Sequence, residues 1–251
     1  MVWSRRAAGF DVTDGQLAAV VERNVALARG LDRDESAQLL GHTSELVGAM
    51  RWEGAAGFEL DDESVVTVAA NAAFVVRNIG LGVYRRVRSV VLWPRAQVTS
   101  TARRGPGGGA VDTSATGVIG LVPGQGDTVA LAWDAVRDQS RHPNLGRNVV
   151  VHEFAHAIDL ADGWSDGLPP LQGADLRGFA DMVEDQYRSA GRARSDAVLP
   201  GYAWTNPAEF FAVASEVFFC RPAALATSKP GLYHVLARWY RQDPAARRAS
   251  S

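Results

Sequence analysis

Three residues in this sequence have the types and the spacing needed for metal chemistry. His152, Glu153 and His156 form the pattern H-E-x-x-H within the segment VVVHEFAHAIDL. Residues four apart lie on one face of an α-helix, so the two imidazoles can bind a single metal ion. Glu153 projects to the side of this pair, where it can reach a metal-bound water without being a ligand. The pattern predicts a site in which two histidines hold Zn²⁺ and the glutamate acts as a general base.

The residues around the motif argue against a chance pair of histidines. A five-residue pattern can arise by chance, but Val149–Ile158 is apolar nearly all round and predicts a buried helix. Polar side chains in such a helix are costly unless they are paired or bind a metal. Asp159 falls on the histidine face and could orient one imidazole. It could equally be a polar residue near the helix end, ahead of Gly163, and the two interpretations have equal weight.

A catalytic zinc site usually has three protein ligands, so a third ligand is expected downstream. His234 lies in GLYHVLARWYRQ and has the character of an ordinary helix histidine. Glu209 and Glu216 lie in the strongly apolar segment NPAEFFAVASEVFF, where a carboxylate needs a partner. The acidic residues of FADMVEDQYR better fit a solvated helix face: Asp181, Glu184 and Asp185.

Spacing alone does not choose between Glu209 and Glu216. They are two turns apart on one helical face, so either could be the ligand with the other beside it. Glu209 also has a structural alternative. Asn206 is a good N-cap and Pro207 suits the first helical position, which places Glu209 at the capping-box position. On these grounds the two glutamates are equal candidates.

Longer segments resemble a known protein family. NVVVHEFAHAIDLADGWSDGLPPL, followed by YAWTNPAEFFAVASEVFF, is similar to the Mlc titration factor A family of bacterial zinc peptidases. RWEGAAGFELDDESVVTVAANAAFVV, VLWPRAQV, ALAWDAV and PGLYHVLARWYRQDP also resemble segments of that family. The resemblance covers roughly residues 50–244, whereas residues 1–49 give much weaker support for membership of this family. It implies an α+β, zincin-like metallopeptidase, mostly helical, with a small sheet beside the active-site helix.

The family in turn resembles the catalytic domain of anthrax lethal factor. That enzyme pairs an H-E-F-x-H-x-x-D helix with a tyrosine seven residues before a glutamate, and here Tyr202 precedes Glu209 by seven. The resemblance therefore implies that Glu209 is the third zinc ligand and that Tyr202 points its phenol at the site. Glu216 becomes a candidate for contact with a ligand. Lethal factor has another glutamate one turn after its ligand, but Val213 stands there in this sequence, so these surroundings are not simply copied.

The function that follows is hydrolysis of peptide or protein substrates by a water bound to one Zn²⁺ per chain. Glu153 would accept the proton of that water, and Tyr202 would stabilise the oxyanion. Tyr202 could instead be a core aromatic. The resemblance also implies an alternative function, a regulatory protein that sequesters a transcriptional repressor, with peptidase activity secondary. A metal-dependent esterase or amidase is a third possibility.

Composition is consistent with an ordinary enzyme. A net charge of −2 argues against direct nucleic-acid binding or attachment to a membrane surface. No apolar run is long enough to cross a membrane, and MVWSRRAAGF lacks the apolar stretch of a signal peptide. The single cysteine, Cys220, allows no internal disulfide and is expected to be a buried apolar residue. Together these features predict a cytoplasmic location.

Periodicity and turn residues predict the elements that position the site. Helices are expected at Gly15–Arg29, Asp34–Met50 and, fully buried, Val65–Arg77; strands at Val87–Trp93 and Val129–Trp133; and a loop at Thr101–Asp112. The second strand precedes the metal helix and could pair with an extended peptide. The expected organisation is an N-terminal tail (1–10), one domain (11–244, with a helical part 11–80 and a catalytic part 81–244) and a disordered C-terminal tail (245–251).

Overall fold

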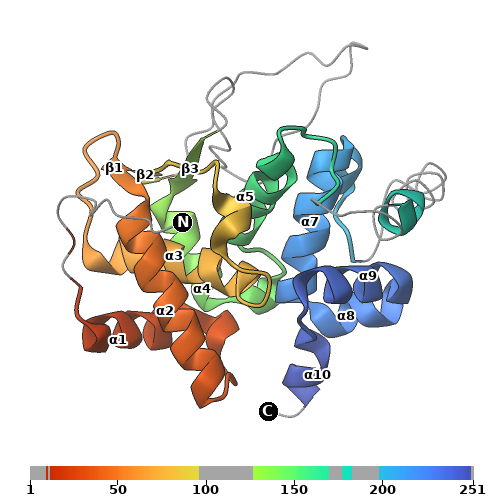
Figure 1. The fold of residues 1–251 in the computed structure, drawn as a ribbon, viewed down its shortest axis with the longest axis horizontal. Helices are drawn as coiled ribbons and strands as arrows, with labels where there is room; N and C mark the ends of the chain where they lie inside the picture. The colour runs from red at the N-terminus through yellow and green to blue at the C-terminus, as the bar shows by residue number, and fades with distance from the viewer. Residues whose placement is uncertain (1–9, 11, 96–126, 170–176, 183–197, 250–251) are drawn as a thin grey trace.

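Helices surround a small parallel sheet in the computed structural model, which describes residues 10, 12–95, 127–169, 177–182 and 198–249 (Figure 1). The strands are β1 (Arg51–Gly54), β2 (Ser89–Trp93) and β3 (Thr128–Ala132), in the order β1-β2-β3. The α-helices in the described ranges include α1 (Asp14–Asn24), α2 (Arg33–Ala49), α3 (Asp62–Val76), α4 (Trp133–Arg141), α5 (Val149–Asp159), α7 (Pro207–Cys220), α8 (Pro222–Ser228), α9 (Pro230–Tyr240) and α10 (Pro244–Ala249). Short 3-10 turns are Ala26–Ala28, Leu81–Tyr84, Pro143–Leu145, Leu160–Asp162 and Gly201–Trp204.

The sheet confirms the two predicted strands and adds a third. β2 and β3 pair in parallel with Val90 opposite Val129, and β1 pairs with β2 with Trp52 opposite Val90. Parallel neighbours need a crossover connection, which α3 provides between β1 and β2. The second strand was expected to extend to Trp133, but this residue begins α4. The chain therefore turns into a helix directly at the end of β3, and α4 separates the strand from α5.

Helix α3 forms the centre of the core, as its unbroken apolar sequence predicts. Every residue from Ser64 to Val76 is buried, and Asp61 caps the helix by accepting a hydrogen bond from the backbone N–H of Ser64 at 2.8 Å. The one amide in this run, Asn71, donates to the carbonyl of Thr67 at 2.8 Å and to Ser140 Oγ of α4 at 3.0 Å. A buried amide is tolerated because these bonds compensate for its loss of water.

The first predicted helix is shorter than expected. The hydrophobic periodicity predicts one helix from Gly15 to Arg29. In the structure, α1 ends at Asn24 and a separate 3-10 turn follows. The Asn24 side chain donates to Glu63 and Thr67 of α3, both at 2.9 Å, and accepts from Arg141. These tertiary bonds explain the break, because they fix Asn24 against α3 and α4 in a way that local sequence does not encode.

The C-terminal segment is also more ordered than predicted. Residues 245–249 were expected to lie in a disordered tail, but they belong to α10, which packs against α8. Arg247 pairs with Glu35 of α2 at 3.1 Å, and Gln242 donates to the carbonyls of Phe74 and Val75 of α3. The chain end is therefore tied to the N-terminal helices. The predicted loop Thr101–Asp112 lies outside the described residues.

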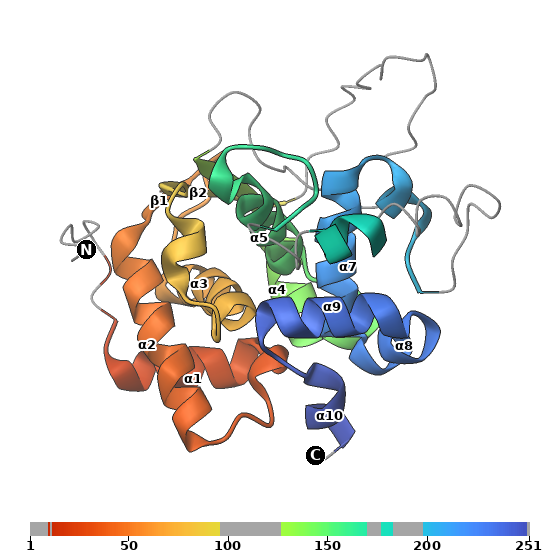
Figure 2. The same cartoon turned by 45° about the vertical axis from the view of Figure 1, so that its right-hand side comes forward.

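Helices α5 and α7 run side by side, in extensive contact (Figure 2). On its other sides α5 contacts β3, α3 and α4, so the H-E-x-x-H segment is enclosed by the core. Within the described ranges, no single helix is long and apolar enough to span a membrane. The pair α7 and α8, bent by 116°, meets that test by length and composition only.

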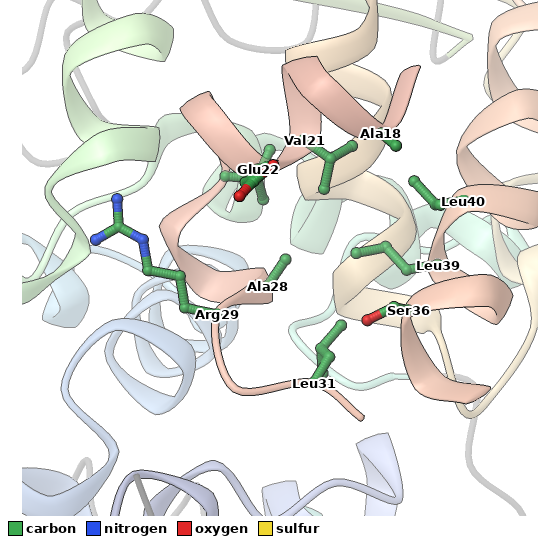
Figure 3. Close-up of a pocket in the computed structure, with 10 residues that line it drawn as sticks. Ala18, Val21, Glu22, Ala28, Arg29, Leu31, Ser36, Leu39 and Leu40 are labelled. Atoms are coloured by element: carbon green, nitrogen blue, oxygen red, sulfur yellow. The ribbon is translucent and has the colours of Figure 1, made fainter. Parts of the chain in front are cut away.

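A cavity of about 590 Å³ lies between α1 and α2, apart from the H-E-x-x-H helix (Figure 3). Its walls are mostly apolar, with charged or polar groups from Glu22, Arg29 and Ser36. All of its lining residues come from the N-terminal part of the chain, Ala18 to Leu40, so it is separate from the residues that could bind a metal.

Candidate metal centre

Helix α5 begins in a buried polar environment that satisfies its first backbone donors. The Asn148 side chain accepts hydrogen bonds from the second and third helical N–H groups, at 3.1 and 3.2 Å. The N–H of Asn148 itself donates to Glu216 Oε1 at 2.6 Å, and the next N–H donates to Gln139 at 2.7 Å. These groups would otherwise be unsatisfied in the core. Asn148 was not among the residues predicted to matter here, although an asparagine directly before an apolar helix is an N-cap signal.

The two histidines of the motif lie on one face of α5, as their spacing predicts. The His152 and His156 rings have centroids 4.9 Å apart and planes at 79° to each other. His152 is 9% exposed, and His156 is partly buried. Both imidazole rings therefore lie mostly in the core, with a small part of each exposed to solvent.

Helix α7 brings Glu209 to these two rings. Asn206 caps the helix by accepting from the N–H of Glu209 at 2.9 Å, and Pro207 takes the first helical position, both as predicted. The Glu209 carboxylate contacts the histidines: Oε2 lies 3.5 Å from His152 Nε2, and Oε1 lies 3.5 Å from His156 Nε2. Its backbone therefore serves the helix cap while its side chain faces the histidines.

The geometry of these three residues fits a tetrahedral metal ion. One ligand atom from each of His152, His156 and Glu209 lies within 4.8 Å of the other two. Ligands bonded at the distances usual for zinc are about 3.3 Å apart in a tetrahedron. The observed 3.5 Å contacts are close to this value and longer than a good N–H···O hydrogen bond. Two imidazoles and a carboxylate are also a usual donor set for catalytic zinc.

Electrostatics at the cluster favour a positive charge. Burial lowers the pKa of His152, but the carboxylates of Glu209 and Glu216 raise it, and the pKa lies well above its ordinary value. Burial raises the pKa of Glu209, but the two histidines hold that pKa well below its ordinary value. The carboxylates thus stabilise a cation at this position, whether it is a proton on the imidazole or a metal ion.

Glu216, the other candidate ligand, lies on the opposite side of His152. Its Oε2 is 3.6 Å from Nδ1, whereas Glu209 faces Nε2. Its side chain is only 5% exposed, compared with 31% for Glu209. The structure therefore brings Glu209, rather than Glu216, together with both histidines, and it places Glu216 behind the first of them.

Tyr202 lies in the 3-10 turn Gly201–Trp204, just before α7. Its ring centroid is 6.4 Å from that of His152, and its hydroxyl donates to Glu216 Oε2 at 3.5 Å. Burial, followed by the nearby Glu216 carboxylate, raises the pKa of Tyr202, so the phenol keeps its proton at neutral pH. A protonated hydroxyl beside the histidines is available as a hydrogen-bond donor.

The two other acidic residues of the α5 motif have different surroundings. Glu153 is 1% exposed, and its charge helps to raise the pKa of His152. The charge of Asp159 interacts with His156, but its hydrogen bonds go to the turn after α5. It accepts from the backbone N–H of Gly167 at 2.7 Å and from Ser165 Oγ at 3.1 Å. Of the two interpretations open for Asp159, the structure supports a role at the helix end, where it holds the following turn.

The remaining sequence candidates lie elsewhere or outside the described residues. His234 is exposed on α9 and is not part of the cluster. Asp181 is exposed in the helical residues 177–182, as a solvated position would be. Glu184 and Asp185 fall outside the described residues. Cys220 is fully buried and forms no disulfide within the chain, as predicted.

Comparison with known proteins gives one family and several relatives. Residues 2–241 match the family described as glucose-regulated metallo-peptidase M90. The chain is 31% identical over 199 residues to an uncharacterized protein of Synechocystis sp., covering 76% of this chain and 70% of that protein. It is 30% identical over 232 residues to Mlc titration factor A of Yersinia pestis and of Yersinia pseudotuberculosis, covering 89% of this chain and 84% of each relative. The family match begins near the N-terminus, well before the segments that carried the sequence resemblance. The relation to lethal factor stays a prediction.

Proposed function

Because the chain belongs to the M90 family of glucose-regulated metallopeptidases, we propose that it is a zinc-dependent peptidase with a zincin-like fold. The observation that carries the proposal is the convergence of His152, His156 and Glu209 from two separate helices. These residues would hold one Zn²⁺. A zinc ion at such a site lowers the pKa of a bound water toward neutrality and polarises a substrate carbonyl.

Glu153 is the general base in this proposal. It directly follows His152, so it lies beside the metal position without being a ligand, as the H-E-x-x-H arrangement requires. Glu153 would take a proton from the water as the water oxygen attacks the scissile carbonyl carbon, and would pass that proton to the amide nitrogen as the C–N bond breaks, so that a neutral amine leaves. The Glu153 side chain is 1% exposed, so bulk water is largely kept away from this carboxylate.

Tyr202 is the oxyanion donor in this proposal. Its phenol is protonated and lies beside His152, on the stretch of chain that leads into the Glu209 helix. A donor held in place before the reaction stabilises the charge that develops on the carbonyl oxygen, typically by about 3 kcal/mol. The hydroxyl bonds to Glu216 at the long distance of 3.5 Å, which is weak enough to be exchanged for a stronger bond to substrate.

The test is zinc analysis and peptide cleavage by wild type and Glu153→Gln. We expect about one zinc per chain in both proteins and hydrolysis only by wild type, because the amide keeps the side-chain shape but cannot accept the water proton. Glu59→Gln, at an exposed glutamate outside the cluster, is a matched control and should cleave normally. Cleavage by Glu153→Gln at the wild-type rate would contradict the mechanism. A zinc-free wild type would contradict the metal site.

A second function is suggested by the name of the Yersinia relatives, Mlc titration factor A, which describes titration of Mlc. A corresponding role here would be sequestration of a transcriptional repressor, with peptidase activity secondary. The Glu153→Gln protein separates the two functions. Sequestration needs a binding surface and should survive this substitution, whereas hydrolysis should not. A reporter gene controlled by the repressor would measure the first, and peptide cleavage the second.

A further inference from the structure

The carboxylate of Glu216 links the start of α5 to His152 and Tyr202, a contact that the proposed mechanism does not use. One oxygen, Oε1, accepts the backbone N–H of Asn148 at the start of α5. The other, Oε2, lies 3.6 Å from His152 Nδ1 and accepts the Tyr202 hydroxyl at 3.5 Å. Glu216 is 4% exposed, so these neighbours, rather than water, surround its carboxylate.

A buried polar chain fixes the Asn148 end of this connection. Asn148 Nδ2 donates to Asn71 Oδ1 of α3 at 2.8 Å, and Asn71 in turn donates to Ser140 of α4 at 3.0 Å. All of these residues are buried. Leaving either amide without a partner in the core would destabilise the fold. These hydrogen bonds therefore hold the polar side chains in one arrangement. The positive end of the α5 dipole adds to the stabilisation of the Glu216 charge.

A neutral imidazole carries its proton on only one nitrogen, and the metal must bind the other. His152 presents Nε2 to Glu209 and Nδ1 to Glu216. A carboxylate beside Nδ1 stabilises the proton there and leaves the Nε2 lone pair for a metal. We propose that Glu216 is a positioning residue that sets the His152 tautomer and ring orientation for metal binding. This inference rests on the metal site of the proposed function.

The alternative is that Glu216 only supports the fold by accepting the Asn148 N–H. Glu216→Gln separates the two roles. The glutamine oxygen can still accept from Asn148, but its NH₂ group then faces His152 Nδ1 and favours the tautomer with the proton on Nε2, which cannot bind a metal. A purely structural residue would tolerate this change, whereas a positioning residue would not.

The experiment measures the zinc affinity of the intact protein by competition with a chromophoric chelator, together with the visible spectrum of the Co²⁺ form. We expect Glu216→Gln to bind zinc about 10–100-fold more weakly than wild type and to show altered cobalt bands, with a melting temperature close to that of metal-free wild type. The matched control is Ser215→Ala, one residue away on α7. Ser215 bonds to Phe211 and Tyr240 in the core, so this variant should lose stability but keep its zinc affinity.

Wild-type zinc affinity and wild-type cobalt bands in Glu216→Gln would overturn the inference and leave Glu216 as a structural residue. Equal losses of zinc affinity in Glu216→Gln and Ser215→Ala would overturn it too, because the effect would then follow α7 stability. The readout is independent of hydrolysis. If wild type binds zinc but cleaves no peptide, the proposed function fails while a weakened Glu216→Gln still supports the positioning role.

Discussion

Two glutamates on one face of α7 differ only in what their carboxylates meet. Glu209, in the first turn, meets the Nε2 atoms of both histidines. Glu216, two turns later, meets the opposite nitrogen of His152 and the start of α5. Residue type and spacing allow either glutamate to be a metal ligand. The choice between them depends on which side chains of α5 each carboxylate faces.

Replacing Glu209 by alanine tests this assignment. We expect Glu209→Ala to weaken zinc binding by more than about 100-fold, since it removes a direct donor, and we expect the loss to exceed that in Glu216→Ala. Metal analysis after dialysis against a fixed free zinc concentration measures both variants. The reverse order, with Glu209→Ala fully loaded and Glu216→Ala empty, would show that Glu216 is the ligand.

Removal of the Tyr202 hydroxyl should reduce catalysis without affecting the fold. We expect Tyr202→Phe to lower kcat by roughly 10–1,000-fold, because a donor to the oxyanion is lost, with little change in zinc content or stability. The ring packs against the core, so Tyr202→Ala should also lower the melting temperature. An unchanged kcat in the phenylalanine variant would identify Tyr202 as a core aromatic only.

At the scale of elements, the turn that follows α5 ties together the two helices that carry the candidate metal ligands. Asp159, the last residue of α5, accepts hydrogen bonds from Ser165 and Gly167. Gly167 has a φ of +76° and packs directly on the backbone of Pro207, where a Cβ atom would approach the Pro207 oxygen to 2.2 Å. Only glycine fits this position, which fixes the end of α5 against the start of α7.

The Asp159 carboxylate should make the stability of this turn depend on pH. Burial raises its pKa from 3.8 to about 6. The folded state therefore keeps the proton up to about pH 6, whereas the unfolded chain releases it near pH 4. Because the folded state binds more protons in this window, its stability should fall as the pH rises from about 4 to about 6, by on the order of 1–3 kcal/mol.

Asp159→Asn should remove this contribution, since asparagine can still accept from Gly167 and has no proton to lose. Urea unfolding of metal-free wild type and variant at several pH values measures the difference in stability between them. We expect the wild type to lose stability relative to Asp159→Asn as the pH rises from about 4 to about 6. A difference that stays constant between pH 4 and pH 6 would contradict the raised pKa.

At the scale of the whole molecule, one continuous apolar core links the N-terminal helices, the sheet and the C-terminal helices. The candidate metal ligands lie where α5 and α7 meet, and Glu209 is distant in the chain from the two histidines. An unfolded chain cannot hold these ligands together, so a metal that binds them stabilises only the folded state.

Zinc removal should therefore lower the melting temperature of the entire chain. A free zinc concentration of 100 times Kd adds about 2.7 kcal/mol, which corresponds to about 5–10 °C for a chain of this size. Thermal unfolding with and without a chelator measures the shift, and Glu209→Ala should show little response. A wild-type melting temperature that does not change with zinc would contradict a folded-state metal site.

Much of the site could be predicted from local sequence, because its determinants are local. The i,i+4 spacing of His152 and His156 places them on one helical face in any context, and Asn206 and Pro207 begin a helix by their own side-chain and backbone chemistry. The uninterrupted apolar run of α3 requires burial wherever it lies. For the same reason, the helical ends in these segments were close to their observed positions.

Tertiary structure alone decided which distant groups meet. No local pattern shows that Glu216 reaches the start of α5, that Asn24 ends α1 through bonds to α3, or that Arg247 ties the C-terminal helix to α2. The strands pair in parallel, and a short stretch of sequence does not show which distant strand another will pair with. For Glu216 and Asn24, the deciding free energy comes from burying a polar group beside a partner far along the chain. For all of these contacts, the stabilising free energy does not exist until the fold brings the partners together.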